Sequence, residues 1–199
     1  MGGVAVKGLR LTVLGLLLAT LYVGSLVLFP VEEVRVEGLK HLKEETVLEA
    51  LRLTPGDPWL WVFPRRAEAL RGNPWVAEAS LEKPRVGAVR VVVRERKPFL
   101  PLEDGQALSE DGVLLPGGAP FARGPKVVGR GPLPKEALLA LARAYPEAHR
   151  LRYTPAGFWV ELPEVTLFAP STELLLKYAQ VPKPKGQVFL YSWGVSQRP

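Results

Sequence analysis

Few residues of this 199-residue chain could do chemistry, and their spacing does not favour it. The two histidines, His41 and His149, lie far apart, and the absence of cysteine excludes disulfides, thiolate metal ligands and a cysteine nucleophile. Each aspartate adjoins a glycine or a proline, as is typical of structural turns: Asp57, Asp104 and Asp111. We therefore expect no catalytic residues, no cofactor, no metal site and a protein that is not an enzyme.

The glycine-rich run GRGPLP (129–134) is the only stretch that a phosphate group could be expected to use. Phosphate loops bind through consecutive backbone N–H groups, and a proline has no N–H to donate. Because Pro132 and Pro134 interrupt the run, we expect no phosphate and no small-molecule substrate there.

Basic residues exceed acidic ones, and the net charge is +6. All 20 acidic residues follow Phe29, together with 24 of the 26 basic residues, so this part of the chain carries only +4. So small and dispersed an excess predicts no nucleic-acid partner. The densest basic run, which a nucleic-acid or cell-wall-binding module could use, contains Arg90, Arg94, Arg96 and Lys97.

Residues 11–29 contain no charged side chain. As a helix they would extend about 28 Å, close to the roughly 30 Å hydrocarbon core of a bilayer. Two basic residues precede the segment and two glutamates follow it, so the positive-inside rule places the N-terminus in the cytoplasm. We expect a cytoplasmic tail (1–10), a single transmembrane helix (11–29) in the inner membrane, and residues 31–199 outside. A cleaved signal peptide is the main alternative, and a buried core helix is another.

The segment 31–97 predicts five elements in the order βααββ. Valines alternate with charged residues in VEEVRVEGL (31–39), which is the periodicity of a strand. Apolar residues at helical spacing and a proline start predict short helices at 43–53 and 64–73. The stretch NPWVAEASLEKPRVGAVRVVVRERKP (73–98) then predicts two strands joined by a turn.

One register of this hairpin satisfies both of its faces. Antiparallel pairing can set glutamates opposite arginines on the solvent face and apolar residues opposite valines on the core face. The basic run is then the solvated side of a hairpin rather than a dedicated binding surface. The register pairs Glu82 with Arg90, Glu78 with Arg94, Leu81 with Val91, and Ala79 with Val93.

This unit resembles a POTRA (polypeptide-transport-associated) domain. The matching features are the V-x-V-x-G-L strand, the EETV helix, the L-x-x-G-D turn, the hairpin NPWVAEASLEKPRVGAVRVVV and the closing ER-x-P. A membrane span followed by one POTRA domain is similar to the FtsQ/DivIB family of bitopic cell-division proteins. The resemblance implies a POTRA domain at 31–97 and an FtsQ-type β-domain at 98–199.

The second segment predicts a mixed sheet with two helices, so the fold class is α+β throughout. Two Glu-Asp-Gly turns predict short hairpins, and Ser171 is a plausible N-cap for the second helix. This layout also resembles the FtsQ β-domain. The expected elements are turns at 103–105 and 110–112, strands at 126–129, 151–154, 157–162, 165–169 and 188–195, and helices at 134–148 and from 171.

The final predicted strand, VFLYSWGV (188–195), is the best candidate for binding another protein. Its three aromatic residues alternate and share one face, which is either core or free surface. A terminal strand at a sheet edge can accept a partner strand, with aromatic side chains as anchors. The candidate partner-binding residues are Phe189, Tyr191, Ser192, Trp193 and Gly194.

The family resemblance implies a scaffold of the bacterial divisome at the septum. Its C-terminal edge would bind FtsB and FtsL, and through them the septal peptidoglycan synthases FtsW and FtsI. The family's last strand often reads I-D-L-R, whereas this chain has Phe-Leu-Tyr-Ser at 189–192, so a partner salt bridge is not expected at that point. The alternative is a POTRA-containing envelope-assembly or protein-translocation factor that captures chains as a chaperone does.

Overall fold

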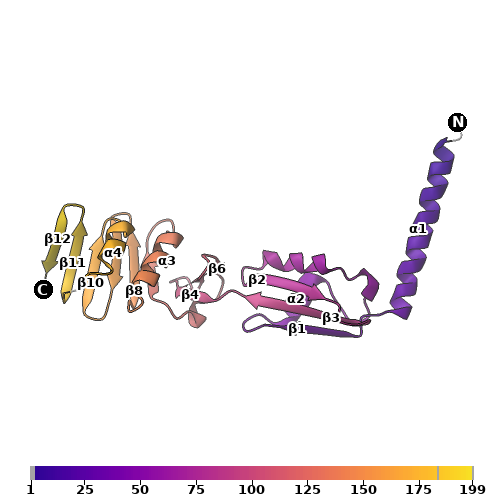
Figure 1. Ribbon diagram of the computed structural model, residues 1–199, viewed down its shortest axis with the longest axis horizontal. Coiled ribbons are helices and arrows are strands. Elements are labelled where there is room, and N and C mark those ends of the chain that lie inside the picture. Colours follow the sequence, from indigo (N-terminus) through magenta and orange to yellow (C-terminus); the bar gives the residue numbers. More distant parts are fainter. Residues whose placement is uncertain (1–2, 183, 199) are drawn as a thin grey trace. The chain divides into compact units, whose positions relative to one another are not determined.

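The computed structural model describes residues 3–182 and 184–198, with side chains from residue 12 onward (Figure 1). The chain divides into two compact units, residues 1–95 and 96–199, which are considered separately below. Both combine helices with sheets, so the predicted α+β class is confirmed.

Helix α1 (Gly3–Leu28) occupies the segment predicted to span a membrane. Within the described part of the chain, however, no helix has the length and apolar character that a membrane crossing needs. The predicted transmembrane helix at 11–29 is therefore not confirmed. The helix ends in a turn that is hydrogen-bonded to it, because the Phe29 N–H donates to the Ser25 carbonyl at 3.1 Å.

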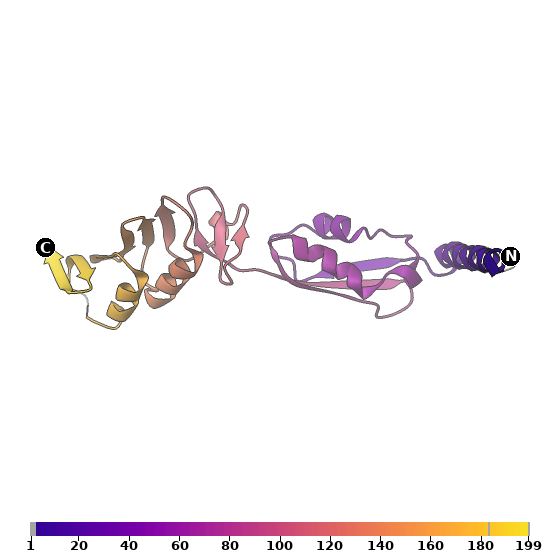
Figure 2. The same cartoon turned by 90° about the horizontal axis from the view of Figure 1, so that it is seen from above.

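The rest of the first unit is a three-stranded sheet covered on one face by helices (Figure 2). The strand order is β1-β3-β2, in which β1 runs parallel and β2 antiparallel to the central strand. The second predicted helix is a 3₁₀ helix, η2, rather than an α-helix. The elements are β1 (Glu33–Glu37), α2 (Glu44–Leu51), η1 (Trp59–Trp61), η2 (Pro64–Gly72), β2 (Val76–Glu82) and β3 (Ala88–Glu95).

The predicted hairpin register is confirmed at all four pairs. Val91 and Val93 are buried against the helices, while the charged partners lie on the opposite face. Gly38, which ends the first strand, has φ +88°, and a Cβ there would lie 2.0 Å from the Val93 carbonyl oxygen. Only glycine fits this close approach, which explains its place in the V-x-V-x-G-L stretch.

The second unit contains a small three-stranded sheet and a six-stranded sheet. The small sheet holds the two predicted Glu-Asp-Gly turns between its strands, as expected. The six-stranded sheet has the order β12-β11-β10-β9-β8-β7. The elements are β4 (Pro98–Pro101), β5 (Ala107–Ser109), β6 (Leu114–Leu115), η3 (Ala119–Phe121), β7 (Lys126–Gly129), α3 (Lys135–Ala144), β8 (Arg150–Thr154), β9 (Gly157–Glu161), β10 (Val165–Ala169), α4 (Thr172–Tyr178), β11 (Gly186–Tyr191) and β12 (Gly194–Arg198).

Helices α3 and α4 pack on the same face of the six-stranded sheet, and their apolar side chains form the hydrophobic core of the second unit together with those of the sheet (Figure 2). The two helices are joined by the buried Tyr145, whose hydroxyl donates to the Leu175 carbonyl. Burial raises the pKa of the Tyr145 phenol, so this hydroxyl keeps its proton and stays a donor. Ser171 is the N-cap residue of α4, as predicted, although its side chain makes no capping hydrogen bond.

The predicted final strand at 188–195 is wrong in its extent. Ser192 and Trp193 form a two-residue turn, so the chain end is a hairpin of β11 and β12. The alternation of apolar and aromatic residues that predicted one strand therefore holds only in β11, because the chain turns after Tyr191. One edge of the six-stranded sheet is therefore β12, which the sequence prediction did not separate from the preceding strand.

Candidate partner-binding edge

Strand β12 lies at the end of the six-stranded sheet and pairs with β11 on one side. The hairpin turn closes on the pair Tyr191–Gly194, and in a two-residue hairpin this flanking pair is hydrogen-bonded. Hydrogen-bonded and non-hydrogen-bonded pairs then alternate along the ladder. The backbone N–H and C=O groups of Val195 and Gln197 consequently point away from β11, where a further strand would pair with them.

The sheet face opposite α3 and α4 carries a row of aromatic side chains from three neighbouring strands. Trp159 of β9, Phe168 of β10 and Phe189 of β11 lie side by side in the strand register. Ring centroids are 4.5 Å apart for the first pair and 6.0 Å for the second. Arg198 of β12 extends this row, with its guanidinium carbon 5.5 Å from the Phe189 ring centroid.

The aromatic residues predicted in the last strand therefore face away from the core. Val188 and Leu190, at the alternate positions of β11, are the buried ones. Phe189 and Tyr191 lie on the opposite face and are half-buried. This finding excludes the interpretation of the aromatic face as core.

The hairpin turn presents a second aromatic pair. The rings of Tyr191 and Trp193 stack in parallel, 5.0 Å between centroids with planes 1° apart, and Trp193 is 80% exposed. A tryptophan this exposed keeps most of its apolar area available to a partner, and tryptophan is enriched among residues that dominate interface energies. Ser192 shares the turn and Gly194 begins β12, so four of the predicted residues lie at the turn end of the edge strand, whereas Phe189 lies opposite Ser196 at its middle.

Sequence reasoning missed the residues that complete this surface on other elements. Trp159 and Phe168 come from strands it did predict, and both occupy the outward positions of their period-two patterns. Both lie beside Phe189 only because β10 pairs in parallel with β11, and these two strands are separated in the sequence by helix α4. That pairing could not be read from alternation alone.

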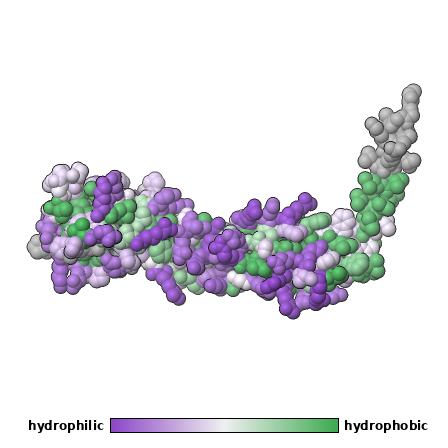
Figure 3. Space-filling model, in the orientation of Figure 1, coloured by the Kyte–Doolittle hydropathy of each residue, from purple (hydrophilic) through white to green (hydrophobic). Residues whose placement is uncertain are grey.

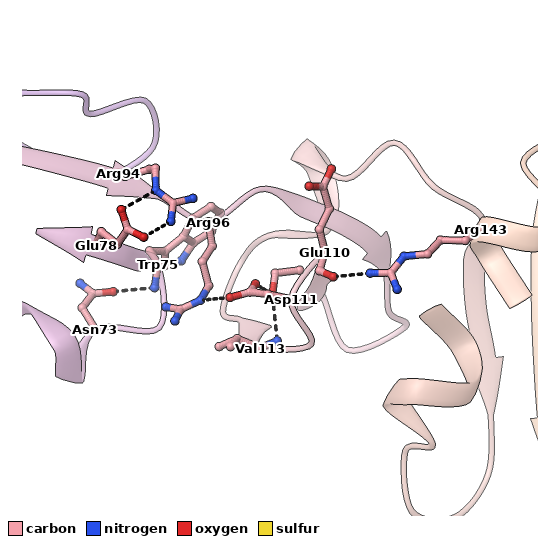
Figure 4. Close-up of polar contacts among 10 residues, drawn as sticks. Asn73, Trp75, Glu78, Arg94, Arg96, Glu110, Asp111, Val113 and Arg143 are labelled. Carbon is pink, nitrogen blue, oxygen red and sulfur yellow. Dashed lines mark hydrogen bonds and ion pairs between the residues drawn. The ribbon is translucent and has the colours of Figure 1, made fainter. Parts of the chain in front are cut away.

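The arginines of the basic run that lie in the first unit form ion pairs with glutamates of the same unit. Arg90 bonds Glu37 in a bidentate pair at 2.6 and 3.0 Å and also reaches Glu82. Figure 4 shows the second pair, in which Arg94 bonds Glu78. The hydrogen bond from Arg90 lowers the pKa of Glu37, so the carboxylate stays charged. This outer face is therefore a ladder of alternating charge rather than a basic surface.

Arg96 is also paired, within the second unit. Its Nε donates to the Asp111 carboxylate at 2.7 Å, and Asp111 in turn accepts from the Ser109 hydroxyl (Figure 4). Burial raises the pKa of Asp111, but the bonds from Ser109 and Arg96 outweigh it and lower that pKa overall. Asp111 thus fixes the β5–β6 turn, which is the structural role that its position beside Gly112 predicted.

Reversing charge at Arg94 and Arg96 together is expected to leave DNA retention unchanged, because neither side chain is free for a phosphate. The measurement is a filter-binding titration at low salt with the wild type and the Arg94→Glu, Arg96→Glu variant. Salt-sensitive DNA binding by the wild type that the double variant abolishes would contradict the charge-ladder interpretation.

The remaining chemistry-bearing residues have structural partners. His41 lies 2.9 Å from Glu95 through Nδ1, and His149 lies 3.7 Å from Glu161. In the part of the chain that the structure describes, no group of three His, Cys, Asp or Glu side chains is arranged to hold a metal ion. Asp57 accepts from Thr54, and Asp104 accepts from Gln106.

Comparisons with known proteins point to the first unit. Residues 29–96 match the family described as POTRA domain, FtsQ-type. A protein described as cell division protein FtsQ, from Anaeromyxobacter sp. (strain K), is 35% identical over 72 residues, which cover 36% of this chain and 24% of that protein. The chain thus spans about a quarter of the length of this curated relative. The predicted resemblance to the FtsQ/DivIB family is confirmed, and it is carried by residues 29–96, which match the POTRA domains of the FtsQ type.

Proposed function

We propose that this chain is a cell-division protein that works as a non-enzymatic scaffold, binding other division proteins at the septum through strand β12. The observation that carries the proposal is an edge strand with outward backbone groups next to the exposed Trp193. The FtsQ-type POTRA domain supplies the cell-division context.

Strand addition suits the composition of this edge. A partner strand gains main-chain hydrogen bonds at alternate residues, while side chains beside the edge select the partner. On one face those side chains are Phe189 and Arg198; at the turn they are Tyr191 and Trp193. A partner segment with apolar residues beside an acidic one would complement both, since Arg198 places positive charge near the strand.

The partners that the family resemblance implies are FtsB and FtsL, with FtsW and FtsI recruited through them. We propose that FtsB and FtsL contact this chain directly. Leu190 and Ser192 stand where the family often has charged residues, so packing on the neighbouring Tyr191–Trp193 pair would replace a salt bridge at that point.

Anchoring in the inner membrane is a further part of the proposal. Support comes from the uncharged sequence at 11–29 and from the apolar side chains of α1 that are exposed from Val13 to Leu28. With two basic residues before this segment, the N-terminus would be cytoplasmic and residues 31–199 would lie outside.

Two measurements test the proposed function. A fluorescent fusion is expected to gather at midcell in dividing cells; an even distribution round the envelope would favour the envelope-assembly alternative.

Deleting residues 194–199 removes β12 but keeps the buried Val188 and Leu190 of β11, and it should abolish co-purification of FtsB and FtsL. Full retention of both proteins by this truncated chain would refute binding at the edge strand.

A further inference from the structure

Two loops of the first unit are tied to the segment that follows α1. The Val31 N–H donates to the Asp57 carbonyl at 2.7 Å, and the Trp59 N–H donates to the Phe29 carbonyl at 2.9 Å. On the other side, the Glu32 N–H donates to the Gly87 carbonyl at 2.8 Å. The loop containing η1 and the β2–β3 turn therefore both lie at the end of the unit that α1 joins.

These loops expose large apolar side chains where polar ones are the rule. Leu60 is 47% exposed, Phe63 44% and Val86 54%, although each comes from a loop or turn with well-bonded backbone. Trp61 packs edge-on against Tyr22 of α1, with ring centroids 5.8 Å apart. Figure 3 shows the hydrophobic surface of α1 continuing onto the adjoining end of the unit. Single exposed apolar residues need no explanation, but a group continuous with an apolar helix does.

Cations accompany the aromatic rings of the same loops. The Arg65 guanidinium carbon lies 5.4 Å from the Phe63 ring centroid, and Lys83 Nζ lies 3.9 Å from that of Trp59. The carboxylates nearby include Glu33, which is paired with Arg85 at 2.7 Å, and Asp57, which is near Arg66 at 3.8 Å. Aromatic and aliphatic side chains interleaved with Arg and Lys are typical of the headgroup layer of a membrane, where apolar bodies meet acyl chains and cations meet phosphates.

We propose that this face of the first unit lies in the headgroup layer of the bilayer that α1 enters. The membrane-proximal face comprises Leu60, Trp61, Phe63 and Val86, with Arg65 and Lys83. The inference rests on the proposed membrane anchoring, and it adds a second contact with lipid. Because the loops are hydrogen-bonded to residues 29–33, lipid contact would hold the POTRA sheet in a fixed orientation to the membrane rather than on a free tether.

The chain has no cysteine, so single cysteines for nitroxide labels can be introduced without background. We suggest Leu60→Cys and Val86→Cys in the full chain, reconstituted in vesicles of phosphatidylethanolamine and phosphatidylglycerol. Lys40→Cys is the aqueous control, since Lys40 is exposed and bonds to Glu95 at the opposite end of β3. Val23→Cys on α1 is the control for anchoring itself.

The measurement is the collision rate of each label with oxygen, which concentrates in lipid, and with a water-soluble nickel chelate. Labels at 60 and 86 should collide with nickel several-fold less often than the label at 40, and with oxygen more often. Nickel access at 60 and 86 equal to that at 40, with position 23 shielded, would overturn the inference and leave the anchoring intact. Nickel access at position 23 as well would refute the anchoring. Shielding with spin–spin broadening would assign the face to a second copy of the chain and likewise overturn lipid contact.

Discussion

Replacing Glu95 by alanine is expected to lower the free energy of unfolding of the first unit by about 1–3 kcal/mol, the cost of removing the one carboxylate that three backbone N–H groups share. The Glu95 side chain is only 3% exposed at the end of β3. Its carboxylate accepts backbone N–H groups of Lys40, His41 and Leu42 at 2.8 to 3.1 Å, and it contacts His41 Nδ1. The Glu95 carboxylate thus binds three consecutive backbone N–H groups, an arrangement called a nest, and it links the β1–α2 loop to the sheet.

The prediction has a pH dependence whose sign follows from this site. Burial raises the pKa of Glu95, but the hydrogen bonds from residues 40–42 outweigh it and hold that pKa below its ordinary value of 4.5. A carboxyl with a lowered pKa in the folded state stabilises above its unfolded pKa and loses this contribution as the pH falls through the folded value. The stability difference between the wild type and Glu95→Gln should therefore shrink below pH 4.5.

Hydrogen-exchange mass spectrometry of residues 38–43 in the intact protein measures the effect at the site itself. Faster exchange there in Glu95→Ala, with a matching loss of stability in urea, is the expected outcome. Glu49→Ala on the exposed side of α2 is the matched control, and its effect should stay within about 0.5 kcal/mol. Equal exchange in the wild type and Glu95→Ala would show that the carboxylate does not hold the loop.

The hairpin of the first unit could be predicted to the residue because both of its faces restrict the register. A slip of one residue would turn Val91 and Val93 to water and would set Arg90 against the core. Every constraint on this pairing lies within one short stretch of sequence. Local patterning therefore sufficed for β2 and β3.

The Glu95 nest could not be predicted because its donors and acceptor are distant in sequence. Glu95 has the parity of Val91 and Val93 on the core face of β3, but alternation alone could not show which groups would receive a carboxylate there. Its burial results from the return of residues 40–42 to the far end of the sheet. The charge pattern was thus a correct guide for Arg90 and Arg94 but not for Glu95.

The chain end shows the same limit at the candidate site. Aromatic alternation placed Phe189 and Tyr191 on one face of a strand, yet it could not reveal that the chain turns at Ser192 and Trp193. A two-residue Ser-Trp turn lacks the Asn-Gly or Asp-Gly signal that marks most such hairpins. The polar run after Gly194 consequently gave no sign that it forms the edge strand.

Gln197→Pro is expected to weaken binding of the FtsB–FtsL complex roughly tenfold or more, because a backbone donor and a close strand contact are lost together. The N–H of Gln197 points outward from the ladder with β11, so its removal breaks no hydrogen bond within the hairpin. Proline is also tolerated at such an edge position. The fold should therefore survive while strand addition fails.

Gln197→Ala is the matched control, since it keeps the backbone donor and removes only the exposed side-chain bond to the Lys185 carbonyl. Its affinity should equal that of the wild type when the dissociation constants are measured on immobilised full-length chain. Trp193→Ala should also lower affinity by roughly tenfold or more if the exposed ring is an anchor. Equal losses for proline and alanine at 197 would assign the binding to the side chain, and undiminished binding by Gln197→Pro would exclude pairing at β12. Because the two substitutions at 197 differ in the backbone N–H, this comparison separates strand addition from side-chain recognition on the same surface.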